Sequence, residues 1–328
     1  MPFRLFLLLV CASFTNSLTA ETLVFVSVAG EKQIATLALN EATGELKHVR
    51  NTAINGEPGP LSLHPSGNSL FASIRNEGRL VSFAIGRKDG ELTKVSEIAA
   101  GADPAYHTTD PSGRYLLSAY YEAAKVCVHS IGEDGALAET PHQTVATDEK
   151  AHGIAFDSSG KFVYVPHTGP NQIYQFRFDS KSGRLSSNKP LAQQFVQRTG
   201  PRHVATHPLA SVLYTNYEQG GKVARLRIVE KNGTLKLLDE ISTLPAGFTG
   251  SHATARMELS PDGRFLYVAN RGPNTIAGYS VDQKTGELTA IGQTPTEPNP
   301  RAFNISPSGK TLVAAGQDSG KLVTFRID

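Results

Sequence analysis

The 328-residue sequence predicts an all-β fold, a seven-bladed β-propeller with incomplete terminal blades. Three observations lead to this prediction. One short motif recurs along the chain, its copies are spaced by 46–53 residues, and no long helical periodicity of apolar residues follows residue 20. Repeats of this length, each with three or four short strands, are typical of a propeller. A solenoid of hairpins is the alternative that the repeat leaves open.

The N-terminal segment has the features of a signal peptide. Arg4 is followed by the apolar run 5–10, and a small residue, Ala20, closes the segment. A cationic start, a short apolar stretch and a small residue at the exit are typical of a cleaved export signal. The apolar stretch is too short for a permanent transmembrane anchor. We therefore expect a signal peptide at residues 1–20, a propeller domain at residues 21–328, and export to the periplasm or the medium.

Composition excludes several classes of function. The net charge of +2 gives no polybasic signature, so we expect no nucleic-acid partner. No second apolar run reaches transmembrane length, so no membrane span is expected. Removal of residues 1–20 would leave Cys127 as the one cysteine, which forbids an intramolecular disulfide. We expect a monomer that uses no cofactor and no metal.

Each repeat contains a tight turn between its first and second strands. The clearest copy is Ser260–Gly263, which is followed by expected strands at 265–269 and 275–281 and by a second turn at Thr285–Leu288. Pro fixes φ and Gly permits positive φ, so both suit such a turn. The first turn recurs at His64–Gly67, Asp110–Gly113, Asp157–Gly160, His207–Ala210 and Ser306–Gly309.

The second strand of each repeat gives the blade count. Equivalent apolar positions in it are Phe25, Phe71, Leu117, Tyr164, Tyr214, Tyr267 and Val313. The chain after residue 20 begins with a second strand at 23–28 and ends with a third strand at 321–328. This predicts seven second and seven third strands, but six first and six fourth strands. One blade is therefore expected to lack its inner strand and another its outer strand.

Two sets of equivalent positions should lie on one face of the disc, because the first and second strands of a blade are antiparallel. At the start of the first strand the residues are Gly59, Ala105, His152, Arg202, Ala255 and Arg301. Just past the second strand they are Ala29, Arg75, Tyr121, Thr168, Glu218, Arg271 and Gln317. Positions that serve only the fold should carry the same type of residue in every repeat, and these positions do not. Broken symmetry at one end of the channel indicates a binding site.

The chemistry of these positions suggests an anion site. Arg202, Arg271, Arg301 and Arg75 would give a cationic mouth suited to carboxylate or phosphate. Two groups could take part in proton transfer, Glu218 and His152. Gln317 and His203 are further candidate substrate-binding residues. The alternative is that all of these are solvated loop residues, with Glu218 simply paired to an arginine.

Other candidates are weaker. His107, His167, His203, His207 and His252 show no metal-ligand spacing. No Gly-x-Ser-x-Gly elbow is present and Cys127 lies inside a strand, so covalent catalysis is not expected. Glu258 is expected either to face the channel or to pair with Arg256.

The sequence resembles the seven-bladed propeller lactonases, which include bacterial 6-phosphogluconolactonases of propeller type and the fungal carboxy-muconate lactonizing enzyme. The stretches that carry the resemblance are Gly200–His203 with Tyr214–Glu218, Ser260–Gly272, and Pro300–Asn304 with Ala314–Asp318, together with Ala151–His152. The resemblance implies catalytic roles for His152, Arg202, Arg271 and Glu218. It also implies a small lactone with an anionic group as substrate, and no metal.

Two departures from the family pattern bear on function. Tyr217 stands between Asn216 and Glu218, where family members usually have Glu directly after Asn. An exported enzyme would also not meet 6-phosphogluconolactone, a cytosolic metabolite. We expect a hydrolase of a small anionic sugar-type lactone, similar to 6-phosphogluconolactonase. The alternatives are a non-catalytic exported propeller that binds an anionic ligand or a protein partner, and a muconate-type lactonizing cycloisomerase.

Overall fold

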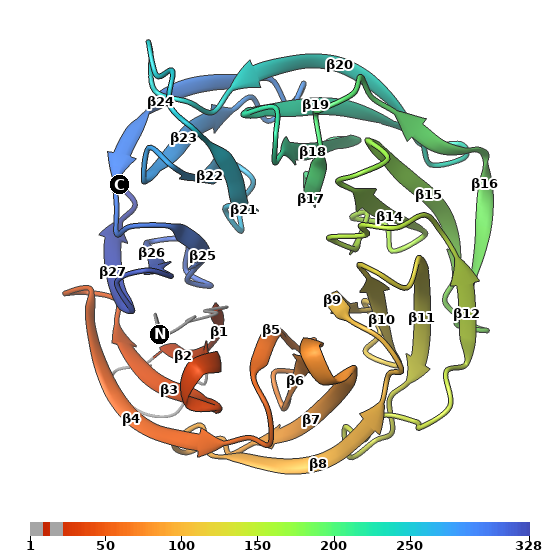
Figure 1. Ribbon diagram of the computed structural model, residues 1–328, viewed down its shortest axis with the longest axis vertical. Coiled ribbons are helices and arrows are strands. Elements are labelled where there is room, and N and C mark those ends of the chain that lie inside the picture. The colour runs from red at the N-terminus through yellow and green to blue at the C-terminus, as the bar shows by residue number, and fades with distance from the viewer. Residues whose placement is uncertain (1–8, 14–21) are drawn as a thin grey trace.

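The protein forms a ring of seven antiparallel sheets around a central channel (Figure 1). A computed structural model describes residues 9–13 and 22–328. In each sheet the strands follow one another in chain order from the channel outward. The helical segments within these residues are two short 3-10 turns, η1 (Ala29–Glu31) and η2 (Arg75–Glu77). The prediction of a seven-bladed β-propeller is confirmed.

The strand bounds are as follows. The first three blades consist of β1 (Leu9–Ser13), β2 (Thr22–Val28), β3 (Gln33–Asn40) and β4 (Glu45–Ala53); β5 (Pro58–Leu63), β6 (Ser69–Ile74), β7 (Arg79–Ile85) and β8 (Leu92–Ala99); and β9 (Pro104–Thr109), β10 (Tyr115–Tyr120), β11 (Lys125–Ser130) and β12 (Gln143–Ala146). The fourth and fifth consist of β13 (Ala155–Phe156), β14 (Phe162–His167), β15 (Gln172–Asp179) and β16 (Arg184–Gln194); and β17 (Pro201–Thr206), β18 (Val212–Tyr217), β19 (Lys222–Val229) and β20 (Thr234–Ser242). The last two consist of β21 (Ala253–Leu259), β22 (Phe265–Arg271), β23 (Thr275–Val281) and β24 (Leu288–Pro295); and β25 (Pro300–Ile305), β26 (Thr311–Gly316) and β27 (Lys321–Arg326).

The terminal blades match the prediction at one end and correct it at the other. Over the described residues the seventh blade has three strands and lacks an outer one, as expected. In the first blade, β1 takes the inner position and pairs with β2 from Leu9↔Val26 to Ser13↔Thr22. The expectation of an empty inner position was wrong, because residues 1–20 were assigned entirely to a signal peptide. Residues 1–8 and 14–21 lie outside the described part, so the signal peptide itself stays a prediction.

The core lies between neighbouring blades and is built from the second and third strands. Phe25, Phe71, Leu117 and Tyr214, at equivalent positions of four blades, are fully buried. β-branched and aromatic residues favour such pleated, two-sided burial. Some buried tyrosines also tie one blade to the next. The hydroxyl of Tyr214 donates to the carbonyl of Gly286 in the following blade at 2.6 Å. Packing and such contacts close the ring.

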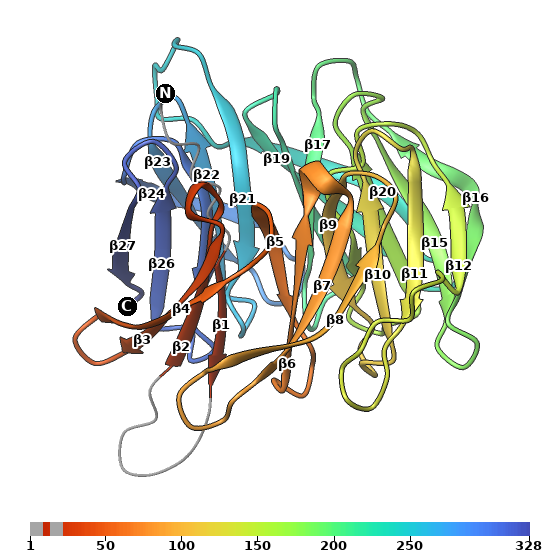
Figure 2. The same cartoon turned by 60° about the horizontal axis from the view of Figure 1, so that its bottom comes forward.

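Five of the inner strands share a β-bulge near their first residues. The register shifts between Pro58 and Leu61 and between Pro201 and Val204, and equivalent shifts occur in β9–β10, β21 and β25. A bulge bends the strand and re-aims its side chains. Consecutive residues such as Arg202 and His203 can therefore both line the channel mouth. Figure 2 shows the blades from the side, with the strands running between the two faces of the disc.

Among the described residues, no helix is long and apolar enough to cross a membrane.

Candidate functional site

The predicted mouth residues lie at one end of the channel. Arg202 and Arg301 are the second residues of β17 and β25. Glu218 directly follows β18, and Arg271 ends β22. Arg75 opens η2 directly after β6. The antiparallel pairing of first and second strands brings these positions to the same face, as the sequence predicted.

The centre of the site is a carboxylate held by two arginines. Oε1 of Glu218 accepts a hydrogen bond from Nη2 of Arg271 at 2.6 Å, and its Oε2 lies 3.4 Å from Nε of Arg202. The backbone N–H of Glu218 donates to the carbonyl of Gly200 at 2.7 Å, which fixes the start of the loop. Nη2 of Arg271 also donates to the carbonyl of Thr254. Glu218 is therefore paired, as the alternative interpretation required, but inside the channel mouth rather than on a solvated loop.

The protonation of Glu218 follows from these neighbours. Burial alone would raise the pKa of Glu218, but the charges of Arg202 and Arg271 outweigh it and hold the pKa below its usual value. The group is thus a carboxylate at neutral pH. It remains partly accessible, with 21% of its side chain exposed, so a ligand in the mouth can reach it.

Arg202 is the most deeply buried cation of the mouth. Its Nη1 donates to the carbonyl of Ala255 at 2.7 Å. Burial lowers the pKa of Arg202 to about 9, partly offset by Glu218. The guanidinium therefore keeps its charge at neutral pH. Its Nε is buried and lies 3.4 Å from Oε2 of Glu218, an ion pair that makes no well-directed hydrogen bond within residues 22–328.

His152 enters the mouth as a neutral imidazole. Burial, with the charges of Arg202 and Arg75, holds the pKa of His152 well below its usual value. Its ring makes edge contacts with Tyr121 at 5.6 Å and His203 at 5.5 Å between centroids. Its Nδ1 is buried and has no hydrogen-bond partner in the described part of the chain. His152 lines the cavity at the mouth together with Arg202 and Arg301.

Arg75 and Arg301 complete the cationic wall. Arg75 binds Asp103 through two hydrogen bonds, Nε to Oδ1 at 2.6 Å and Nη2 to Oδ2 at 2.8 Å. Its guanidinium also lies 5.9 Å from the ring centroid of Tyr121. Burial, with the charges of Arg271 and Arg75, lowers the pKa of Arg301 to about 10. Arg75, Asp103 and Arg301 line one cavity of about 170 Å³ at this face.

The two remaining candidates differ in their positions. His203 lies under Arg202, with Nδ1 3.1 Å from the carbonyl of Ala255. Nη1 of Arg202 lies 3.1 Å from the same Nδ1 and 3.2 Å from Nε2, so the imidazole packs directly against the guanidinium. Gln317 is held by Asn299, whose Nδ2 donates to its Oε1 at 3.5 Å and whose carbonyl accepts from its backbone N–H. Gln317 is not among the residues that line the two cavities described at the mouth.

Tyr217 does not displace the carboxylate that follows it. Its ring is buried, packs against Phe195 and donates a hydrogen bond to Glu240 at 3.0 Å on the outer side of the blade. Asn216 points the other way, and its Nδ2 donates to Thr254 and to the carbonyl of Ala255. The extra residue therefore packs into the blade, and Glu218 keeps its position against Arg271.

Three further residues contact the predicted residues of the mouth. The sequence analysis placed Tyr121 at one of the equivalent positions without a role and did not single out Asp103 or Tyr106. Asp103 holds Arg75, Tyr121 contacts both Arg75 and His152, and Tyr106 contacts His203 at 5.3 Å between ring centroids. Asp103 and Tyr106 each lie one position away from Pro104 or Ala105, the start of their strand. Inspection of the residues next to each equivalent position, as well as of the position itself, would have identified these residues as candidates.

The arrangement is suited to an anion and to a developing negative charge. Arg75, Arg202, Arg271 and Arg301 face Glu218 and Asp103, and Glu57 lines the same end of the channel, so positive charges outnumber negative ones at the mouth. Fixed guanidinium groups in a partly desolvated site stabilise an oxyanion strongly. Across the described ranges, no three His, Cys, Asp or Glu side chains gather as metal ligands. The site thus offers charged donors, one carboxylate and one neutral imidazole.

Comparison with known proteins gives a consistent result. The family described as "Lactonase, 7-bladed beta-propeller" matches residues 16–328. A 6-phosphogluconolactonase of Pectobacterium carotovorum is 31% identical over 210 residues, which are 64% of this chain and 63% of that protein. The Bacillus subtilis 6-phosphogluconolactonase is 31% identical over 220 residues, 64% of this chain and 62% of that protein. The chain thus matches less than two thirds of the length of these relatives.

A solved structure matches over almost the whole chain. The periplasmic gluconolactonase of Pseudomonas aeruginosa superposes with a TM-score of 0.82 at 26% identity, and the match covers 99% of this chain and 92% of that one.

Proposed function

This chain belongs to the family of seven-bladed β-propeller lactonases, and from that premise we propose that it hydrolyses a small sugar-type lactone bearing an anionic group. The observation that carries the proposal is the position of Glu218 between Arg202 and Arg271 at the mouth of the channel. The names of the curated relatives and of the structural neighbour support lactone hydrolysis.

In the proposed reaction a water molecule attacks the lactone carbonyl. Glu218 accepts a proton from the water as the water oxygen bonds to the carbonyl carbon. Arg202 and Arg271 stabilise the oxyanion that forms. The ring C–O bond then breaks, and the proton is delivered to the ring oxygen, which becomes a hydroxyl. His152, which lines the cavity, assists this delivery. The product is an open hydroxycarboxylate.

The remaining cations would hold the anionic group of the substrate. Arg301 and Arg75 line the cavity of about 170 Å³ at the mouth, and Asp103 holds Arg75 in place. Guanidinium groups match carboxylate and phosphate geometry through paired hydrogen bonds. His203 supports the site from below, and Gln317 is not assigned a role. We further propose that the protein is exported. An exported enzyme would meet an extracytoplasmic sugar lactone rather than 6-phosphogluconolactone.

Purified protein lacking residues 1–20 should be assayed on gluconolactone, 6-phosphogluconolactone and a muconate-type lactone, with mass spectrometry of the products. We expect one or more lactones to open to the hydroxyacid faster than in buffer. A Glu218→Gln/Arg271→Ala double variant should reduce this rate to the background rate. Wild-type turnover no better than that of the double variant contradicts the proposal, and a bound but unchanged ligand would indicate a binding propeller. Lactone formation from an open acid would indicate the cycloisomerase.

The pH dependence tests the identity of the base. Because Arg202 and Arg271 lower the pKa of Glu218, its carboxylate persists as the pH falls, and activity should be lost only below the usual carboxyl range. In Arg271→Gln one of these charges is removed, so the pKa of Glu218 rises. The acid limb of kcat/KM should then move to higher pH by about one unit. Arg225→Gln, which alters an arginine outside the mouth, is the control and should leave the limb in place. An unmoved limb in Arg271→Gln would mean that another group titrates.

A further inference from the structure

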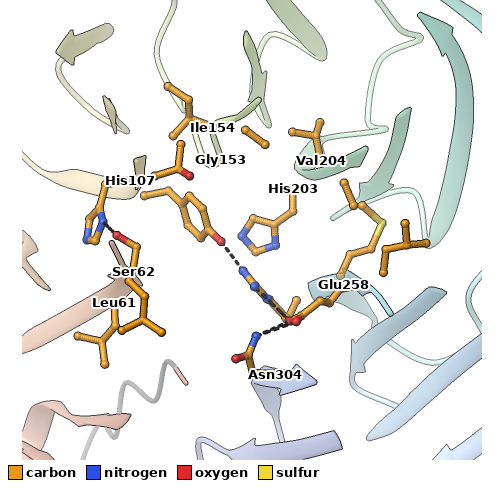
Figure 3. A pocket seen from close by; sticks show the side chains of 17 residues that line it. Leu61, Ser62, His107, Gly153, Ile154, His203, Val204, Glu258 and Asn304 are labelled. Carbon is orange, nitrogen blue, oxygen red and sulfur yellow. Dashed lines mark hydrogen bonds and ion pairs between the residues drawn. The ribbon is translucent and has the colours of Figure 1, made fainter. Parts of the chain in front are cut away.

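A second cavity lies in the channel beyond the proposed active site. Its volume is about 410 Å³, which is within the range of small-molecule sites. Its walls come from the inner strands β5, β9, β17, β21 and β25 and from the segment around β13 (Figure 3). Many of its lining side chains are only half-buried, which indicates an opening toward the face opposite the mouth.

Three side chains separate this cavity from the mouth. Nη1 of Arg256 donates to the hydroxyl of Tyr106, which lies three blades away around the ring. The ring of Tyr106 in turn contacts His203 at 5.3 Å between centroids. These three residues line both the second cavity and the mouth. They form a barrier across the channel, so the two cavities lie back to back.

Equivalent positions around the second cavity break the repeat, as those of the mouth do. The positions compared lie three residues after the set that starts each inner strand, which runs from Gly59 to Arg301. The side chains there are Ser62, Thr108, Ala155, Ala205, Glu258 and Asn304. The polar members come from the second, third, sixth and seventh blades, and the two alanines from the fourth and fifth. One half of the cavity is thus polar, and the opposite half is small and apolar.

The polar half contains an ion pair whose charges cancel. Nη2 of Arg256 lies 3.2 Å from Oε2 of Glu258, and Nδ2 of Asn304 donates to Oε1 and Oε2 of Glu258 at 2.8 and 2.7 Å. The sequence prediction that Glu258 faces the channel or pairs with Arg256 is confirmed in both respects. A partly desolvated ion pair is weak evidence for stability, because desolvation offsets the attraction between the charges. A role in binding gives a reason for its presence.

Hydrogen-bonding capacity remains for a ligand. Within residues 22–328, Glu258 and Tyr106 take three of the five N–H donors of Arg256. His107 donates from Nε2 to the carbonyl of Pro60 at 3.1 Å, so its Nδ1 accepts from the hydroxyl of Ser62 at 2.7 Å. The Ser62 oxygen can then accept from a ligand. Donors and acceptors therefore converge on one side of the cavity.

We propose that this cavity binds a neutral polyhydroxylated ring of hexose size. A sugar ring has a hydroxyl-rich edge, which matches the Ser62, Arg256, Glu258 and Asn304 side, and an apolar face, which matches Ala155 and Ala205. The cancelled charges of Arg256 and Glu258 favour a neutral ligand over an anion. The site goes beyond the proposed hydrolysis and does not depend on it, because the barrier separates it from Glu218.

Isothermal titration and saturation-transfer NMR with D-glucose test the proposal, with D-glucitol as the open-chain polyol and citrate as the anion. D-glucose cannot be hydrolysed, so the result is independent of lactonase activity. We expect D-glucose to bind more tightly than D-glucitol. Glu258→Gln, which keeps the shape and removes the charge, should weaken binding by about tenfold. Ala205→Phe, which fills the apolar side, should abolish it; Ala155→Leu is a second filling variant in case the first does not fold.

Glu218→Gln is the matched control in the mouth and should leave D-glucose binding unchanged. Equal loss in Glu218→Gln would place the sugar in the mouth and overturn the proposal. Absence of D-glucose binding, or equally tight binding of D-glucitol, would also overturn the proposal. So would an unchanged affinity for D-glucose both in Glu258→Gln and in a filling variant that folds. Preferential citrate binding that is lost in the filling variants would indicate an anion site instead.

Discussion

Replacement of Glu218 by Gln should lower kcat on the hydrolysed lactone by about 10²–10⁴-fold without raising KM. The amide has the size of the carboxylate but cannot accept the proton of the attacking water. It also removes the negative charge that Arg202 and Arg271 now share. These two cations then become more available to the anionic group of the substrate, so ground-state binding should hold or strengthen. The measurement is steady-state kinetics across pH, in which the acid limb should disappear.

A matched control exists in the same blade. Glu240 also accepts from two partners, Tyr217 at 3.0 Å and Lys222 at 2.9 Å, but it lies in β20 at the outer side. Glu240→Gln should therefore keep the wild-type kcat and its pH profile. If Glu218→Gln retains kcat within about tenfold of wild type, the carboxylate is not the base. His152→Gln would then be the variant expected to lose the acid limb.

The fold could be predicted from the sequence because every blade buries equivalent side chains against its neighbours. A residue such as Tyr214 must be buried between two blades in any copy, so its equivalents recur at a regular spacing and reveal the repeat. The inner strand β1 could not be predicted in the same way. Its place depends on backbone pairing with β2, whereas its apolar composition by itself favours an export signal.

The position of the mouth was also predictable, since residues that break a repeat are visible in the sequence. The partners within it were not. The sequence does not tell whether Arg202, Arg271 or Arg301 binds Glu218. Bulges near the starts of β17 and β25 bear on the direction of Arg202 and Arg301, and Arg271 lies at the end of β22. Gln317 occupies an equivalent position and yet bonds to Asn299. Equivalent backbone positions thus bring side chains to one face, and local geometry decides which of them meet.

Contacts across the channel are beyond any repeat comparison. Arg256 and Tyr106 stand 150 positions apart, in blades that share no strand pairing, and their hydrogen bond depends on how wide the closed ring is. The local pair of Arg256 and Glu258 was accessible from sequence, because residues two apart in a strand point to the same side. The barrier between the two cavities follows from closure of the ring rather than from any one blade.

Arg202→Lys should lower kcat and kcat/KM together by about 10²–10³-fold. The guanidinium of Arg202 donates to the carbonyl of Ala255 and still directs its Nε into the mouth beside Glu218. A lysine ammonium keeps the charge, but one nitrogen atom cannot hold the Ala255 carbonyl and meet the oxyanion in the same fixed geometry. A loss confined to the transition state lowers both parameters equally.

Arg225→Lys provides the matched control for this change. Arg225 is also largely buried, with 12% of its side chain exposed, and it binds Asp239 through two nitrogens on the outer strands of the same blade. If both variants melt close to the wild-type temperature and only Arg202→Lys loses turnover, the loss belongs to the oxyanion contact. A rise in KM with unchanged kcat in Arg202→Lys would instead place Arg202 on the anionic group of the substrate, because uniform binding affects KM and leaves the chemical step untouched.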